Sequence, residues 1–121
     1  MSDTISNLMD SNLLEVFNEP DADRRAEVIG RIYTDDVAWS DAEGVVVGRA
    51  ALQAKATELL AQFAGLEFAK LGEVRQTSGF GFLAWRLSPP GGEPVATGFD
   101  AAVIRDGRIA QLFTVVDPPR G

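Results

Sequence analysis

Two aspartates in this sequence stand where an ordinary strand or loop does not call for a carboxylate. Asp100 lies in the stretch GFDAAVIRDGRI (residues 98–109), whose pattern predicts a strand. Both faces of that strand carry only small or apolar side chains around Asp100. Burying an ionised carboxylate is costly unless it is paired, hydrogen-bonded or neutralised. If Asp100 lines an apolar cavity, desolvation raises its pKa and makes it a candidate general acid or base.

Asp41 is the second candidate. It follows Trp39 by two residues, so both side chains point the same way if this segment is a strand. A plainer interpretation exists for each aspartate. Asp41 could simply open the turn at residues 41–44, since aspartate favours turns by bonding its own backbone. Asp100 could be a structural carboxylate paired with Arg86 on a neighbouring strand.

The absence of two residue types narrows the chemistry. The sequence contains no cysteine and no histidine. It therefore has no disulfide, no thiol nucleophile and no thiolate metal site, and it lacks the commonest general base and metal ligand. We expect neither a metal nor a cofactor, so any acid–base chemistry rests on carboxylates.

Length and composition predict a single domain over residues 1–121. Hydrophobic residues make up 45% and charged residues 24%, as in ordinary globular proteins. Neither a membrane-spanning run nor a secretory signal is visible, which makes the cytoplasm the default location. The net charge is −7, and residues 1–60 hold 12 acidic and 5 basic side chains. Without a basic patch, we expect no nucleic acid and no membrane as partner.

The elements that must position the aspartates are three helices followed by long strands. Apolar spacing predicts helices over residues 4–18, 21–33 and 49–63, the second capped by Asp21. Strands are expected at residues 37–39, 45–47, 66–77, 80–87, 94–105 and 109–116, with Asp106-Gly107 as a hairpin turn. This order indicates an α+β fold with helices on one face of a mostly antiparallel sheet. Because the long strands lack a clean polar face, we expect a homodimer through the sheet.

Two segments carry a resemblance to a known family. IYTDDVAWSDAEGVVVGRAAL (residues 32–52) and TGFDAAVIRDGRIAQLFTVVDP (residues 97–118) resemble the nuclear transport factor 2-like superfamily, within it the polyketide-cyclase (SnoaL-like) and ketosteroid-isomerase-like proteins. With the order of the helices, the resemblance covers roughly residues 4–118. It implies a cone-shaped curved sheet wrapped against three N-terminal helices, a mostly apolar pocket at the open end, and homodimers through the outer sheet face.

The resemblance also implies roles for both aspartates. Asp41 matches the position of the general base in ketosteroid isomerases, and Asp100 matches a strand aspartate that faces the pocket. In those isomerases a neutral aspartate of this kind donates a hydrogen bond to the developing enolate.

Departures from the family pattern argue against three enzyme types. Leu13 stands near the position of the isomerases' oxyanion tyrosine, and the only tyrosine is Tyr33. Gly98 stands where epoxide hydrolases of the superfamily carry an arginine, and scytalone-dehydratase types need histidine.

Two classes of function remain. The first is a cofactor-free isomerase, cyclase or lyase acting on an apolar carbonyl compound, with Asp100 and Asp41 as catalytic residues. Its expected ligand contacts are aromatic: Tyr33, Trp39, Phe17, Phe63, Trp85 and Phe113. The second is a non-catalytic ligand-binding or dimeric scaffold protein of the same fold. In either case these aromatic side chains could instead belong to the core or to the dimer interface.

Overall fold

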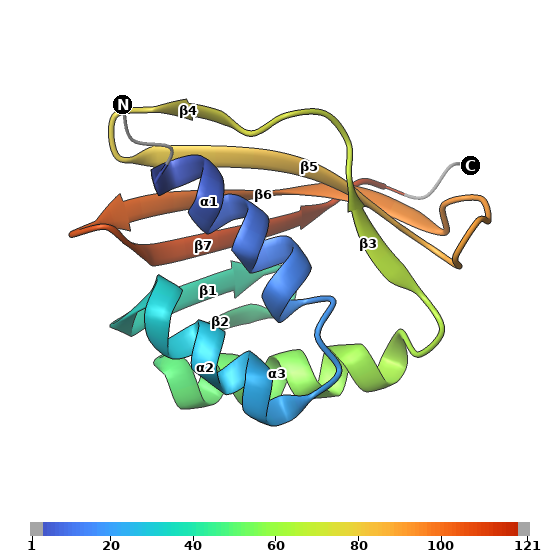
Figure 1. Cartoon of the computed structure of the whole chain (residues 1–121), viewed down its shortest axis with the longest axis horizontal. Coiled ribbons are helices and arrows are strands. Elements are labelled where there is room, and N and C mark those ends of the chain that lie inside the picture. The colour runs from blue at the N-terminus through green and yellow to red at the C-terminus, as the bar shows by residue number, and fades with distance from the viewer. Residues whose placement is uncertain (1–3, 119–121) are drawn as a thin grey trace.

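The computed structural model describes residues 4–118, which form three helical segments and a curved sheet (Figure 1). Helix α1 (Thr4–Ser11) continues directly into a π-helical turn, η1 (Asn12–Val16). Helix α2 spans Ala22–Ile32 and helix α3 spans Arg49–Gln62. The predicted cap of α2 is confirmed, because the Asp21 carboxylate accepts the backbone N–H groups of Asp23 at 2.9 Å and Arg24 at 3.3 Å.

The sheet is mixed and open. Its strands are β1 (Tyr33–Asp41), β2 (Gly44–Val47), β3 (Glu67–Lys70), β4 (Arg75–Thr77), β5 (Phe80–Ser88), β6 (Ala96–Arg105) and β7 (Arg108–Val116). The order is β2-β1-β7-β6-β5-β3, and β4 also pairs with β5. Every pair is antiparallel except β1 with β7. The α+β cone with a mostly antiparallel sheet is therefore confirmed.

Two strand predictions needed correction. The single strand expected over residues 66–77 is wrong, because β3 and β4 are separate strands that pair with different parts of β5. Gly72 lies between them with φ of +92°, a conformation that turns the chain away from the extended path. The strand expected at residues 37–39 is longer, since β1 begins at Tyr33 and pairs with both β2 and β7.

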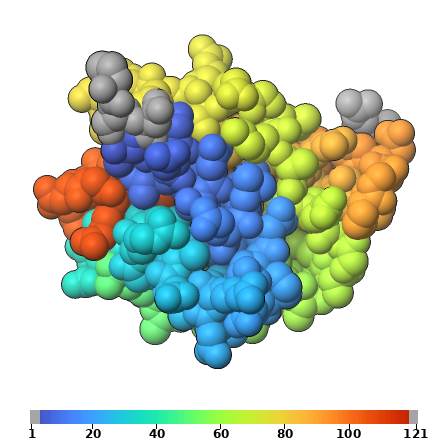
Figure 2. All heavy atoms as spheres, viewed as in Figure 1, coloured from blue at the N-terminus to red at the C-terminus, as the bar shows by residue number. Residues whose placement is uncertain are grey.

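The helices lie on one side of the sheet and cover its concave face (Figure 1). Helix α1 packs against β5, while α2 and α3 pack against β1. Gly81 permits the close approach of α1, since a Cβ there would lie 2.8 Å from Ile5 and 2.9 Å from Met9. In the space-filling view the blue and cyan residues of α1 and α2 occupy the middle of this face (Figure 2).

The outer face of the sheet carries an apolar patch beside the polar residues Arg86 and Thr97. Phe82 and Phe99 stack there with ring centroids 5.0 Å apart. Phe113 lies on the adjoining strand β7 with 38% of its surface exposed. The outer face therefore lacks the clean polar pattern of a solvent-facing sheet, as the sequence indicated.

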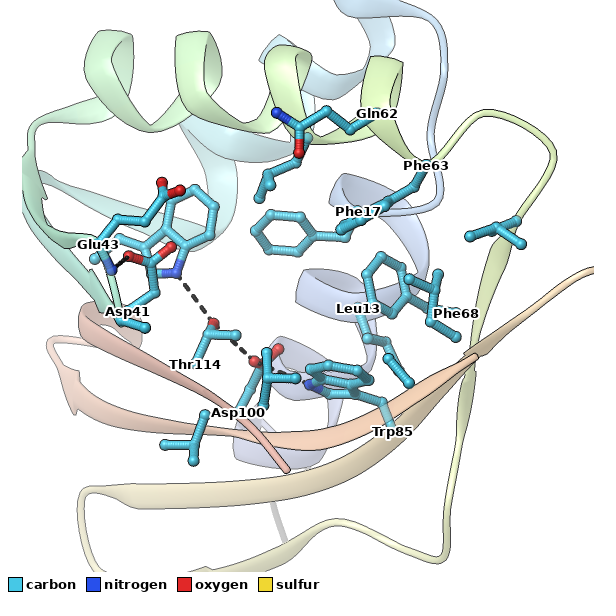
Figure 3. A pocket seen from close by; sticks show the side chains of 18 of the residues that line it. Leu13, Phe17, Asp41, Glu43, Gln62, Phe63, Phe68, Trp85, Asp100 and Thr114 are labelled. Atoms are coloured by element: carbon cyan, nitrogen blue, oxygen red, sulfur yellow. Dashed lines mark hydrogen bonds between the residues drawn. The ribbon is translucent and has the colours of Figure 1, made fainter. Parts of the chain in front are cut away.

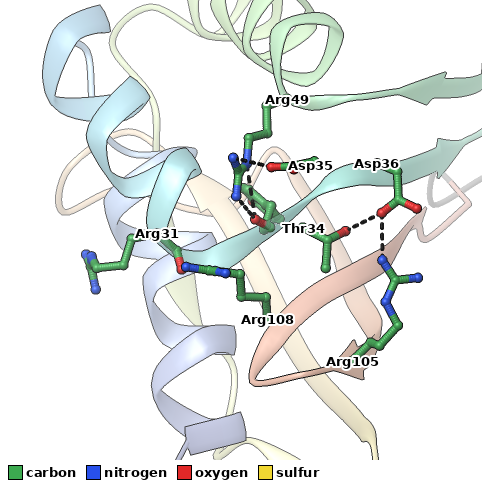
Figure 4. Close-up of polar contacts among 8 residues, drawn as sticks. Arg31, Thr34, Asp35, Asp36, Arg49, Arg105 and Arg108 are labelled. Atoms are coloured by element: carbon green, nitrogen blue, oxygen red, sulfur yellow. Dashed lines mark hydrogen bonds and ion pairs between the residues drawn. The ribbon is translucent and has the colours of Figure 1, made fainter.

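The acidic pair Asp35-Asp36 belongs to a network at the start of β1 (Figure 4). Asp35 pairs with Arg49 at 2.6 Å, and Asp36 pairs with Arg105 at 2.7 Å. The hydrogen bond from Arg105 is the main cause that lowers the pKa of Asp36. Arg49 also donates to the Tyr33 carbonyl at 2.7 Å. These contacts join β1 to α3 and to the β6–β7 hairpin, so the pair has a structural role.

Candidate active site

A cavity of about 750 Å³ opens between the helices and the concave face of the sheet (Figure 3). This volume lies in the range of small-molecule sites. The lining is mostly aromatic and aliphatic, with a few polar side chains: Leu13, Phe17, Trp39, Ser40, Asp41, Ala42, Glu43, Leu59, Gln62, Phe63, Leu66, Phe68, Trp85, Leu87, Val95, Ala96, Asp100, Thr114, Val115 and Val116.

Five aromatic side chains form a continuous wall of this cavity. The ring of Phe17 lies 5.1 Å from Trp39 and 6.4 Å from Phe68, measured between centroids. Phe68 in turn lies 5.2 Å from Trp85 and 6.4 Å from Phe63. These separations are typical of tilted and edge-to-face aromatic pairs. The wall is therefore packed in advance of any ligand.

Asp100 lies on the concave face of β6 and is 3% exposed. Its carboxylate accepts three hydrogen bonds. Asn12 Nδ2 donates to Oδ2 at 2.9 Å, while Thr114 Oγ1 and Trp85 Nε1 donate to Oδ1 at 2.9 and 3.2 Å. The salt bridge between Asp100 and Arg86, which was the plainer interpretation of the sequence, is not among these contacts. Arg86 lies opposite Thr97, on the other face of the sheet.

Two hydrogen-bond relays converge on Asp100. In the first, Trp39 Nε1 donates to Thr114 Oγ1 at 3.0 Å, and Thr114 donates onward to the carboxylate. In the second, the Tyr33 hydroxyl donates to Asn12 Oδ1, and the Asn12 amide donates to Asp100. Because Tyr33 uses the amide oxygen, the NH₂ group of Asn12 has to face Asp100. The network thus fixes the orientation of the carboxylate.

Burial raises the pKa of Asp100 to about 6, and the bonds from Thr114, Trp85 and Asn12 oppose that rise. At pH 7 a group with this pKa is about nine-tenths ionised. The indole N–H of Trp85 can only donate, so it too matches an ionised acceptor. The pKa of Tyr33 is raised well above 10, first by burial and then by the charge of Asp100, so Tyr33 remains a donor. The site is therefore built for an ionised Asp100 at neutral pH.

Asp41 also lines the cavity but is held by other groups. Its Oδ2 lies 2.6 Å from Lys55 Nζ, and its Oδ1 accepts the backbone N–H of Glu43 at 2.9 Å. The second contact is the turn predicted as the plainer interpretation. Lys55 also lies 5.0 Å from the centroid of the Trp39 ring. Thr114 is drawn between the two carboxylates in Figure 3, and no direct contact joins Asp41 to Asp100.

The aromatic residues expected as ligand contacts fall into three groups. Phe17, Trp39, Phe63 and Trp85 line the cavity. Tyr33 is fully buried and reaches Asp100 only through Asn12. Phe113 differs from the expectation: it pairs with Ala101 across the sheet and points to the outer face. Side chains alternate along a strand, so Phe113 points away from the cavity while its neighbour Thr114 points in.

Sequence reasoning missed the polar partners of Asp100. Asn12 follows Leu8 by four residues and Met9 by three, so it is a polar residue on the apolar stripe of the first helix. Thr114 likewise interrupts the inward-facing series of β7, two residues after Leu112. Both could have been found as polar residues on faces that otherwise pack inward.

The packing around Gly98 leaves no room for a side chain at the position where the resemblance places the arginine of epoxide hydrolases. A Cβ at this position would lie 2.3 Å from the Val115 carbonyl oxygen and 2.7 Å from a ring atom of Trp85. Any side chain there would displace the indole that donates to Asp100. The backbone approach and the Trp85 bond therefore exclude an Asp-Arg-Asp arrangement.

Comparison with known structures agrees with this fold. A candidate isomerase of the SnoaL-like family from Agrobacterium tumefaciens superposes with a TM-score of 0.88 at 24% identity, over 97% of this chain and 100% of that one. A proposed SnoaL-like polyketide cyclase from Jannaschia sp. gives 0.74 at 18% identity, over 97% and 90%. A proposed ketosteroid isomerase from Kribbella flavida gives 0.69 at 14% identity, over 99% and 85%. At these identities the likeness shows the fold alone.

Fold and site together define an α+β cone that holds an apolar cavity and one buried carboxylate. The model of the SnoaL-like domain matches residues 11–112, so the chain belongs to the SnoaL-like family of the nuclear transport factor 2-like superfamily. Comparison with curated protein sequences finds no significant match. Within residues 4–118 there is no cluster of three or more potential metal ligands, and no helix there could cross a membrane.

Proposed function

We propose that this protein is a cofactor-free isomerase, cyclase or lyase in which Asp100 moves a proton on a small apolar carbonyl compound. The observation that carries the proposal is the buried Asp100 carboxylate, which faces an aromatic cavity and has a pKa of about 6. A carboxylate with a pKa of about 6 is mostly ionised at neutral pH, and it is a stronger base than an ordinary aspartate with a pKa of 3.8.

In the proposed reaction an ionised Asp100 oxygen removes a proton from the carbon next to the ligand carbonyl. The C–H electron pair passes into the enolate, and the proton stays on Asp100. Returning the proton to a different carbon of a conjugated enolate completes an isomerisation. In a cyclisation the enolate carbon attacks the carbon of a second carbonyl, and the alkoxide that forms takes the proton from Asp100. The Trp85, Thr114 and Asn12 donors hold the carboxylate in position before the ligand arrives.

We assign Asp41 a secondary part at the cavity wall. Because Lys55 holds it at 2.6 Å, it acts as half of an ion pair that can orient a polar group of the ligand. It would become a base only if Lys55 moved away. Asp100 has no such cation among its partners, which makes it the primary base.

The test is exchange of the α-protons of 2-tetralone in D₂O, followed by NMR. This ketone is small and neutral and carries acidic C–H bonds, so the test requires no knowledge of the natural substrate. The wild type should accelerate exchange, Asp100→Asn should abolish the acceleration, and Asp41→Asn should retain most of it. Circular dichroism checks that each variant is folded. Equal exchange by the wild type and Asp100→Asn would remove Asp100 as the base.

The alternative is a binding protein without catalysis. It is favoured by one observation: all the donors around Asp100 are used to stabilise the carboxylate itself. Such a protein would bind 2-tetralone and would show no enzyme-dependent exchange. Both alternatives use the same cavity.

We also propose a homodimer through the outer sheet face, because the Phe82–Phe99 pair and Phe113 form an apolar patch on that face. Sedimentation velocity should show a dimer for the wild type, and Phe113→Lys should shift the distribution to monomer. A wild-type monomer at micromolar concentration would contradict this.

A further inference from the structure

We propose that the cavity admits neutral ligands and rejects anionic ones, so that the substrate is an uncharged carbonyl compound and not a carboxylate, sulfate or phosphate ester. The inference deepens the proposed function and uses the same cavity. It concerns binding, however, and holds whether or not the protein is a catalyst.

The charged residues that line the cavity are all acidic. Asp41, Glu43 and Asp100 are among its lining residues, and within the described part of the chain no lysine or arginine joins them. Lys55 is close by but already committed, at 2.6 Å from Asp41 and 3.8 Å from Glu43. Its side chain is only 13% exposed. A ligand anion therefore meets carboxylates without a free countercharge.

The hydrogen-bond donors near the base of the cavity are also committed. Asn12 and Trp85 donate directly to Asp100, and Thr114 does the same while accepting from Trp39. An anion that enters loses its hydration and gains neither a cation nor an unused donor from this group. At neutral pH it also approaches the ionised Asp100 across a poorly solvated space, where repulsion between like charges is strong.

A neutral ligand avoids the repulsion between like charges and loses less hydration free energy than an anion does. The wall of Phe17, Trp39, Phe63, Phe68 and Trp85 offers apolar surface, whose burial supplies the binding energy. Glu43 lies toward solvent, with a side chain that is 81% exposed, and offers only acceptors to a polar group on the ligand. Charge therefore determines which flat apolar molecules can bind.

The test compares two ligands of nearly the same shape. N-phenyl-1-naphthylamine serves as a neutral fluorescent probe, with energy transfer from the indoles of Trp39 and Trp85 showing that it occupies the cavity. It is then displaced at pH 7.5 by 2-naphthamide or by 2-naphthoate. We expect the amide to displace the probe at a concentration at least about tenfold lower than the carboxylate.

Variants then assign the discrimination to the cavity. Glu43→Gln and Asp100→Asn each remove one negative charge from the lining. Each should therefore reduce the gap, that is, the ratio between the concentrations of carboxylate and amide that displace the probe. Glu27→Gln makes the same charge change on the exposed surface of α2 and should leave the gap as in the wild type. If Asp100→Asn does not fold, Glu43→Gln against Glu27→Gln decides the matter.

Equal displacement by the two ligands would overturn this inference and leave the proposed reaction intact. A gap that stays the same in both cavity variants would also overturn it, because the rejection would then come from the overall charge. If the probe does not bind the wild type at all, the proposed ligand cavity fails and this inference fails with it. Selective binding without proton exchange would support the inference and contradict the catalytic proposal.

Discussion

The contribution of Asp100 to the stability of the protein should fall as the pH rises from 4 to 7, because Asp100 becomes ionised while buried. Its pKa is 3.8 in an exposed chain and about 6 in the fold. The folded state therefore binds more protons than the unfolded state between these values, and its stability declines through that window. At 1.36 kcal/mol per pKa unit, the full decline from Asp100 is about 3 kcal/mol. Above pH 7 this contribution is constant.

The replacement Asp100→Asn isolates this contribution from all other titrating groups. Asparagine has nearly the same shape and does not titrate, so the variant keeps every other pH effect. Asp36, whose pKa is lowered, works in the opposite direction and is present in both proteins. The difference in the free energy of unfolding, wild type minus variant, should therefore drop by about 2.4 kcal/mol between pH 4 and pH 7, because part of the full decline lies below pH 4.

Urea unfolding followed by circular dichroism at half-unit pH steps measures this difference. The decline should be centred between pH 4 and 6 and should level off by pH 7. A difference curve that is flat would mean that the three donors cancel the cost of burial. A curve that rises with pH would mean that they exceed it, and Asp100 would then be too weak a base for the proposed role.

Three further substitutions test the contacts that shape the site and its frame. Asn12→Leu removes a donor from Asp100 and should raise the pKa of that carboxyl by about one unit, measured by ¹³C NMR titration; an unchanged pKa would contradict the relay. Gly98→Ala should cost at least about 2 kcal/mol in urea unfolding, since its Cβ meets backbone oxygen at 2.3 Å. Arg25→Ala should cost about 2 kcal/mol, because this 2% exposed guanidinium joins α2 to α3, whereas the exposed Arg24→Ala should change stability by less than about 0.5 kcal/mol.

Local patterns predicted the frame of the molecule well. The Asp21 cap, the third helix and the hairpin at Asp106-Gly107 each depend on a few neighbouring residues, and all three are present. Asp106 and Gly107 both have positive φ, at 54° and 76°, as a two-residue hairpin turn of this type requires. The apolar character of both faces around Asp100 likewise indicated that the carboxylate is buried, as the fold confirms.

The partners of Asp100 depend on contacts between distant parts of the chain. Asn12 is 88 residues away from it in sequence, and only the packing of the first helix on the sheet brings them together. Phe113 points outward because it pairs with Ala101, whose side chain also lies on the outer face of the sheet. Composition does not reveal this pairing. The break at Gly72 similarly depends on how β3 and β4 divide the length of β5. Sequence patterns therefore predicted Asp100 as the candidate base, and they did not predict Asn12 and Thr114 as its hydrogen-bond donors.

The central claim is that the ionised form of Asp100 removes a proton from a ligand carbon. Its most direct test is the pH dependence of α-proton exchange in 2-tetralone between pH 4.5 and pH 8. The enzyme-dependent rate should rise with pH, show a midpoint near the Asp100 pKa of about 6 and level off above it, and Asp100→Asn should abolish it. A rate that falls with increasing pH, or the same profile in Asp100→Asn, would contradict the claim.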